Sequence, residues 1–94
     1  MRDVRIIVLP HGWVLIGDYW REGAMAGCRG GACVIRRWGT TRGLGQIAKE
    51  GPTNDTKLDP QPETSWNAMA EVMTIRVNDE AWPGGPEDWA EGHG

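Results

Sequence analysis

Residues 4–20 read VRIIVL, PHG and WVLIGDYW, and this stretch decides the fold. Residues 4–9 are rich in β-branched side chains, which favour extended backbone, and Pro10 ends the run because proline lacks the N–H that a strand interior needs. His11 and Gly12 supply a turn before the second apolar run, residues 13–20. Two such runs separated by a tight turn predict a pair of neighbouring strands.

Working outward, the next segments also predict extended structure. Residues 21–23 break the second strand, and residues 24–31 are small and rich in glycine, which indicates a weak or bulged strand followed by a turn. Residues 32–38, ACVIRRW, predict a further strand that ends on two arginines and a tryptophan.

The second half of the chain is less regular. Residues 44–50 predict a short helix with Leu44, Ile47 and Ala48 on one face. Residues 53–63 contain Asn, Asp and Pro and predict a long irregular connection. Alternation over residues 72–77 predicts a last strand, whereas residues 68–70 are compatible with strand or helix.

These elements predict a mainly β fold with one short helix, in which a small antiparallel sheet curls into a barrel or a sandwich with long loops. The chain has 94 residues, which corresponds to one domain. We assign residues 1–82 to a single small β-rich domain and residues 83–94 to a flexible acidic tail, because Trp89 is almost the only side chain there that could be buried.

The composition predicts a thin core and an uneven charge distribution. The chain has no Phe and six Trp, and a domain of this size buries only about 60–65% of its unfolded surface, so we expect a homo-oligomer. Residues 1–49 hold eight Lys and Arg against three Asp and Glu, whereas residues 50–94 hold two against ten. The acidic half argues against binding of duplex DNA.

Other functional classes receive little support. The longest apolar run, residues 6–9, is far shorter than the roughly 18–20 residues of a membrane span, and the expected location is cytoplasmic with no membrane partner. Cys28 and Cys33 are expected to be reduced, and with His11 and His93 they show no zinc-binding spacing. No catalytic triad is apparent. We therefore expect no metal, no cofactor and no enzymatic activity.

One segment, residues 36–45 (RRWGTTRGLG), concentrates the features of a ligand site. Arginines donate bidentate hydrogen bonds to phosphate or carboxylate, threonines add hydroxyl donors, glycines admit close approach to the backbone, and a tryptophan offers a stacking surface. The segment is neither a P-loop nor a dinucleotide fingerprint. The candidate ligand-binding residues are Arg36, Arg37, Trp38, Gly39, Thr40, Thr41, Arg42, Gly43 and Gly45.

The same residues also have a purely structural interpretation. Arg36 and Arg37 are adjacent in a strand and should point to opposite faces, so one could pair with an acid of the C-terminal half while the other is solvated. Trp38 could belong to the core, a threonine could cap the helix, and the glycines could serve turn geometry alone. Both interpretations stay open at the level of the sequence.

Part of the sequence resembles a family of small uncharacterised proteins from tailed bacteriophages and prophages. The resemblance is carried by residues 32–48, which include IRRWGTTRGLG over residues 35–45, and by residues 51–53 and 57–60. The resemblance includes the Gly-Trp-Val segment at residues 12–14 and the acidic-Trp element at residues 79–82. The sequence departs from the family pattern at residues 63–72 and after Pro83. The resemblance implies a phage accessory protein that acts in the bacterial host cytoplasm, but it carries no activity that can be transferred.

Two functions follow as hypotheses. In the first, the protein counters host defence by sequestering a nucleotide-type signalling molecule at residues 36–45, without turnover. In the second, its acidic C-terminal half inhibits a host defence or nucleic-acid-handling protein, with Trp66, Trp82 and Trp89 as aromatic anchors in a charged surface.

Overall fold

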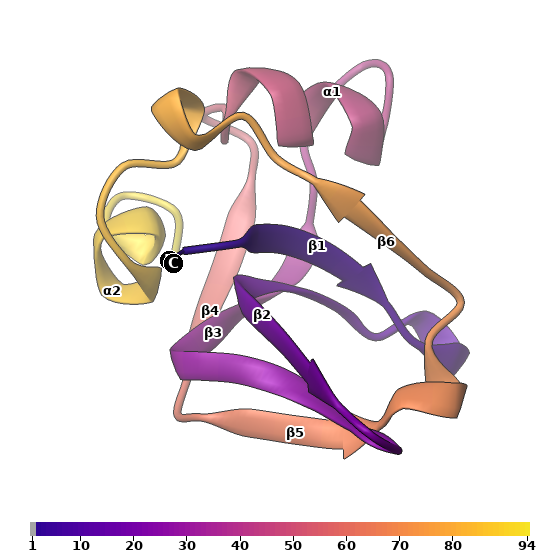
Figure 1. Ribbon diagram of the computed structural model, residues 1–94. Coiled ribbons are helices and arrows are strands. Elements are labelled where there is room, and N and C mark those ends of the chain that lie inside the picture. Colours follow the sequence, from indigo (N-terminus) through magenta and orange to yellow (C-terminus); the bar gives the residue numbers. More distant parts are fainter. Residues whose placement is uncertain (1) are drawn as a thin grey trace.

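The computed structural model describes residues 2–94 and shows a mainly β protein. Six strands form one antiparallel sheet in the order β4-β3-β2-β1-β6, and β5 pairs with β3 beside that path (Figure 1). The strands are β1 (Val4–Val8), β2 (Val14–Glu22), β3 (Met25–Arg37), β4 (Lys57–Gln61), β5 (Thr64–Asn67) and β6 (Met73–Arg76). The sheet is curled but does not close into a barrel. The predicted fold class is confirmed.

The strand pair predicted from residues 4–20 is present. β1 and β2 are joined by the 3-10 turn Pro10–Gly12, and their register runs from Val4 opposite Asp18 to Val8 opposite Val14. His11 adopts a left-handed backbone with φ of 64° inside this turn. The β-branched residues of β1 lie in an interior strand, between β2 and the edge strand β6.

The curl of the sheet comes from a bend in β3 and β2. β3 is one long strand, whereas the sequence predicted a weak strand, a turn and a second strand. Gly30 and Gly31, both with positive φ, mark the bend, and the pairing with β2 shifts register there, between Gly17 and Asp18. A Cβ on Gly17 would lie 2.7 Å from the sulfur of Cys28, so the close approach of the two strands requires glycine.

The two faces of the sheet carry two apolar clusters. Ile6 and Ile7 are both fully buried and, as neighbours in a strand, point into different clusters. The larger cluster is covered by the helices α1 (Leu44–Glu50) and α2 (Pro86–Ala90) and includes Trp82. The smaller one, around Tyr19 and Cys28, is enclosed where the sheet curls over towards β5.

The second half of the chain is more ordered than predicted. The helix at residues 44–50 is confirmed, but the connection predicted for residues 53–63 contains β4, an edge strand that tolerates Pro60. Residues 68–70, left open above, form a 3-10 turn. β6 covers residues 73–76 of the predicted last strand.

The segment predicted as a flexible tail folds onto the domain. α2 packs against β3 and β4, and Trp89 is only 5% exposed. Its ring meets the ring of Trp82 edge to face, with centroids 5.6 Å apart, and its indole N–H donates to the carbonyl of Pro83. His93 accepts a hydrogen bond from the backbone N–H of Leu58, which covers the outer edge of β4. The buried tryptophan and this backbone hydrogen bond therefore hold the short segment against the sheet.

Candidate functional site

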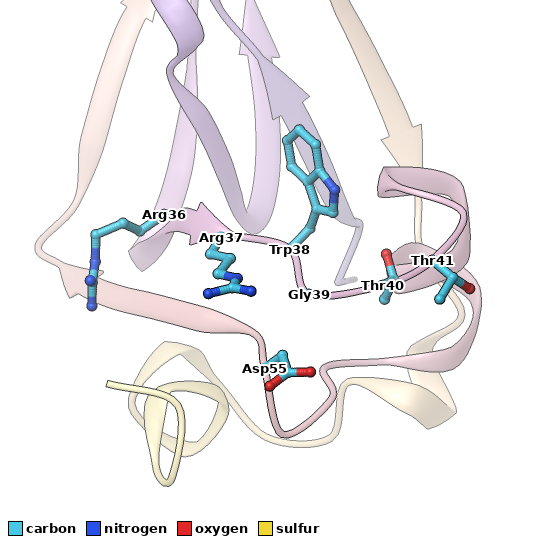
Figure 2. A pocket seen from close by; sticks show the side chains of 7 residues that line it. All are labelled: Arg36, Arg37, Trp38, Gly39, Thr40, Thr41 and Asp55. Carbon is cyan, nitrogen blue, oxygen red and sulfur yellow. The ribbon is translucent and has the colours of Figure 1, made fainter.

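The loop after β3 borders an open cleft of about 470 Å³. Figure 2 shows the residues that line it, which are Arg36, Arg37, Trp38, Gly39, Thr40, Thr41 and Asp55. Six of the nine residues predicted from the sequence therefore lie together. Of the remaining three, Arg42 and Gly45 line a separate groove between α1 and β6, and Gly43 precedes α1 as its N-cap residue.

The two arginines lie on the same side of the strand end, which corrects the expectation of opposite faces (Figure 2). The pairing of β3 with β4 shifts register between Ile35 and Arg37, so Arg36 sits in a bulge. A bulge interrupts the strict alternation of side chains along a strand. Arg36 Nε and Nη2 donate to the two carboxylate oxygens of Asp59 at 2.9 and 3.3 Å. The structural interpretation of the sequence therefore holds for Arg36, which meets an acid of the C-terminal half.

Arg37 and Asp55 are the charged groups of the cleft that lack such a partner. Neither side chain forms an ion pair or a side-chain hydrogen bond with any residue in the described part of the chain. Figure 2 shows them facing the same space from two different segments. The cleft thus combines one guanidinium donor with one carboxylate acceptor.

Trp38 lines the cleft and supplies an aromatic surface beside it. Its side chain is 43% exposed, so it is not a core residue. In Figure 2 its indole points to the opposite side of the chain from the guanidinium of Arg37. A ligand that contacts both groups therefore has to be elongated, with an anionic part near Arg37 and a flat ring near Trp38.

Gly39 is required by the backbone around it. Its φ is +69°, and a Cβ there would lie 2.5 Å from the carbonyl carbon of Asp55. The turn at residues 53–56 is held against this point by two threonines. Thr56, fully buried, donates to the carbonyl of Trp38 at 2.6 Å, and Thr53 donates to the carbonyl of Gly39 at 2.8 Å. Sequence reasoning missed Thr53, Asp55 and Thr56, because nothing in the sequence places this turn beside Trp38.

The hydroxyl protons of Thr40 and Thr41 are engaged within the loop itself. Thr40 donates to the carbonyl of Gly43 at 2.6 Å, and Thr41 donates to Oε1 of Gln46 at 3.2 Å. The same Gln46 oxygen accepts the backbone N–H of Arg42 at 2.8 Å. Among the described residues, no side chain caps α1 at its N-cap residue Gly43, and Gln46 instead ties the preceding loop to the helix through Arg42 and Thr41. The two threonines retain only hydroxyl oxygens as acceptors for a ligand.

The remaining titratable clusters have structural roles. Glu71 accepts hydrogen bonds from the hydroxyl of Tyr19 and from the indole N–H of Trp66, and burial together with the Glu71 contact raises the pKa of Tyr19. Burial raises the pKa of the Cys28 thiol to about 12 and that of Cys33 to about 11. Within residues 2–94, no three His, Cys, Asp or Glu side chains gather where they could hold a metal ion.

Comparisons with family models, with curated proteins and with solved structures give no significant match to this chain. The resemblance to phage proteins therefore stays a prediction. In the described residues, none of the helices is both long enough and apolar enough to pass through a lipid bilayer. Fold and site together define a small curled β domain with an open cleft that combines cationic and aromatic groups.

Proposed function

We propose that the protein is a non-enzymatic binding protein that captures a nucleotide-type molecule in the cleft after β3. The observation that carries this proposal is the pair formed by Arg37, whose guanidinium has no protein partner in residues 2–94, and the exposed indole of Trp38. Arginine binds a phosphate through paired N–H donors, and an exposed tryptophan stacks on a base. Because both residues line one cleft, an elongated ligand with a phosphate and a base suits them.

The charge balance of the cleft narrows the class of ligand. Asp59 already neutralises Arg36, and Asp55 offsets the charge of Arg37. A triphosphate would bring several negative charges to a cleft with little net positive charge. Cyclic nucleotides and ADP-ribose-type molecules carry fewer charges per base, and their ribose hydroxyls can donate to the carboxylate of Asp55. We therefore propose ligands of this kind.

An open cleft on a small domain also supports the proposal of a homo-oligomer. Arg36 borders a second depression that includes Trp13, whose side chain is 55% exposed. Arg36 thus lines both depressions, one of which includes Trp38 and the other Trp13. Aromatic side chains with this exposure are typical of subunit contacts. A neighbouring subunit placed there would cover the cleft and exclude water from a bound ligand.

The biological setting proposed here rests on the resemblance to phage proteins. A phage protein that binds a nucleotide signal stoichiometrically in the bacterial cytoplasm would lower the free concentration of that signal and so counter host defence. No turnover is needed for this effect. Mass spectrometry of nucleotides incubated with the protein should recover them unchanged.

Calorimetry against a panel of cyclic and ADP-ribose-type nucleotides tests the proposal. We expect at least one to bind, and we expect Arg37→Ala and Trp38→Ala each to weaken binding by roughly tenfold or more. A charge-assisted hydrogen bond contributes about 1.5–3 kcal/mol, and a base stacked on an aromatic side chain about 1–3 kcal/mol. Arg29→Ala is the matched control, because Arg29 is exposed on β3 and does not line the cleft. Absence of binding across the panel, or equal binding by all variants, would show the proposal to be wrong.

The acidic inhibitor is the second candidate, and the structure removes part of its basis. Trp82 and Trp89, two of its three proposed anchors, are buried against each other in the core. The exposed carboxylates of Glu87 and Glu91 near α2 still favour a basic partner. A pull-down from host lysate at low and high salt tests this candidate, and the absence of a salt-sensitive partner would exclude it.

A further inference from the structure

The strand β6 lies at an open edge of the sheet. It pairs with β1 on one side, and within residues 2–94 no strand pairs with its other side. Val77, just after β6, donates its backbone N–H to the carbonyl of Val4. Because hydrogen-bonded pairs alternate along an antiparallel ladder, the backbone N–H and C=O groups of Met73 and Ile75 also point towards β1. Thr74 and Arg76 consequently direct their backbone N–H and C=O groups away from the sheet. Such groups are a template for another strand.

A groove of about 620 Å³ runs along this open edge, between α1 and β6. Its apolar floor includes Ala48 and Ile75, and Figure 1 shows α1 and β6 on the same side of the molecule. Asn78 closes one end, because its backbone N–H donates to the carbonyl of Ala48 and its side-chain amide donates to the carbonyl of Lys49. The groove therefore lies beside the unpaired backbone groups and has a fixed end.

The rim of the groove is basic. Arg42, Lys49 and Arg76 line it, and Glu50 is the one carboxylate among the described lining residues. The three basic side chains form no ion pair or side-chain hydrogen bond within residues 2–94. In a chain with a net charge of −3, this is a locally positive surface with no acid of the same chain bound to it.

We propose that this edge and groove bind an extended acidic segment of a partner protein as an additional strand. The backbone of the segment pairs with Thr74 and Arg76, which supplies affinity independent of sequence. Every second side chain of the added strand points into the groove, where carboxylates meet the basic rim. Val72 and Met73, 60% and 51% exposed, extend the contact with apolar surface beside the edge.

Charge selects this partner over a second copy of the chain. Pairing of two β6 edges about a twofold axis would bring Arg76 and Lys49 of both copies to one seam, and like charges facing each other across strands are destabilising. An acidic segment instead forms opposite-charge pairs at the same positions. This docking surface is separate from the cleft at Arg37 and does not depend on the function proposed for it.

Fluorescence anisotropy with a labelled peptide of about eight alternating Thr and Glu residues tests the proposal. At about 3.3 Å per residue, such a peptide is long enough to extend past the four residues of β6. We expect the full chain to bind this peptide, and to bind a Thr-Lys peptide of equal length at least about tenfold more weakly. The double variant Lys49→Glu/Arg76→Glu should lose binding of the acidic peptide. The double variant Arg21→Glu/Arg29→Glu, at exposed positions of β2 and β3 outside the groove, is the charge-matched control and should keep it.

Two further measurements separate strand addition from loose electrostatic attraction. Gly45 has open space at its Cβ position and no positive φ, so Gly45→Trp should fill the groove without disturbing the fold and should block the peptide. Amide hydrogen exchange should slow at Thr74 and Arg76 when the peptide is bound. Equal binding of both peptides, binding by Gly45→Trp, or unchanged exchange would each overturn the proposal. So would slow exchange at these amides in a dimer without peptide, because a second copy would then occupy the edge.

Discussion

Replacing Gly39 with alanine places a methyl carbon 2.5 Å from the carbonyl carbon of Asp55 and 2.6 Å from the nitrogen of Thr56. Both are backbone atoms, so the turn at residues 53–56 has to move. The left-handed φ of +69° costs an alanine about 1–2 kcal/mol. Displacing the turn also loosens the hydrogen bonds from Thr53 and Thr56, each worth about 1 kcal/mol. We expect Gly39→Ala to lower the free energy of unfolding by at least about 3 kcal/mol.

Two other glycines of the same loop provide matched controls. Gly43 has φ 74° and ψ −149° but open space at its Cβ position, so Gly43→Ala should cost about 1–3 kcal/mol from backbone strain alone. Gly45 lies in α1 without positive φ and with open space, so Gly45→Ala should raise stability by up to about 1 kcal/mol. Urea unfolding followed by tryptophan fluorescence measures all three. If Gly39→Ala is as stable as the parent, or less damaging than Gly43→Ala, the structural role assigned to Gly39 is wrong.

Three further predictions concern the core, the thiols and the assembly. Trp89→Ala should cost about 3–5 kcal/mol in urea unfolding, because it empties a buried site against Trp82. Met69→Ala, at a side chain that is 89% exposed, should cost less than about 1 kcal/mol, and similar losses in the two variants would contradict the packing of α2. Burial raises the pKa of Cys28 to about 12 and that of Cys33 to about 11, so both thiols stay protonated in the folded state, whereas an unfolded thiol has a pKa of about 8.5. Above that pH the unfolded state binds fewer protons than the folded state, so the free energy of unfolding measured in urea should fall from about pH 9 upward. Rapid thiol labelling at about pH 8 without denaturant would refute this. Light scattering at micromolar concentration should give a mass above the 10.4 kDa of one chain, and a value at 10.4 kDa regardless of ligand and salt would exclude the homo-oligomer.

The sequence predicts those parts of the fold whose signal is local. β-Branched runs around Pro10 are sufficient for β1 and β2, and helical spacing is sufficient for α1. β4 is different, because Pro60 and the neighbouring Asp59 are unusual in a strand. They are tolerated at an edge, where one side of the strand needs no partner strand. Only the position of β4 in the sheet, which the sequence does not reveal, makes this composition acceptable.

The packing of the C-terminal segment also could not be predicted from the sequence. Trp89 is surrounded in the sequence by glycine, proline and acids, which are typical of a mobile tail. Its partner is Trp82, held in turn by a hydrogen bond from its indole N–H to the carbonyl of Ile47 at 3.1 Å. The two rings are close in the chain, but Trp82 is anchored on Ile47, which lies far from it in the sequence, and no local pattern reports that contact.

The candidate site was predicted as a group, but the roles of its residues had to come from the structure. Arg36 is bound to Asp59, Gly39 is needed for the approach of the turn at residues 53–56, and the hydroxyl protons of the two threonines are used inside the loop. An alanine scan of this segment therefore measures stability before it measures binding. Arg37 is the exception, since its side chain is exposed at the end of β3 and has no partner in the described residues to lose.

This difference decides how the binding function has to be tested. Loss of binding in Gly39→Ala or Thr56→Val would follow from a displaced loop even if the cleft held no ligand in the native protein. Loss of binding in Arg37→Ala at unchanged unfolding free energy has no such explanation, because that substitution removes only a solvated guanidinium. A weakened affinity together with an unaltered urea midpoint in Arg37→Ala is thus the combination that separates a ligand site from a loop built for its own stability.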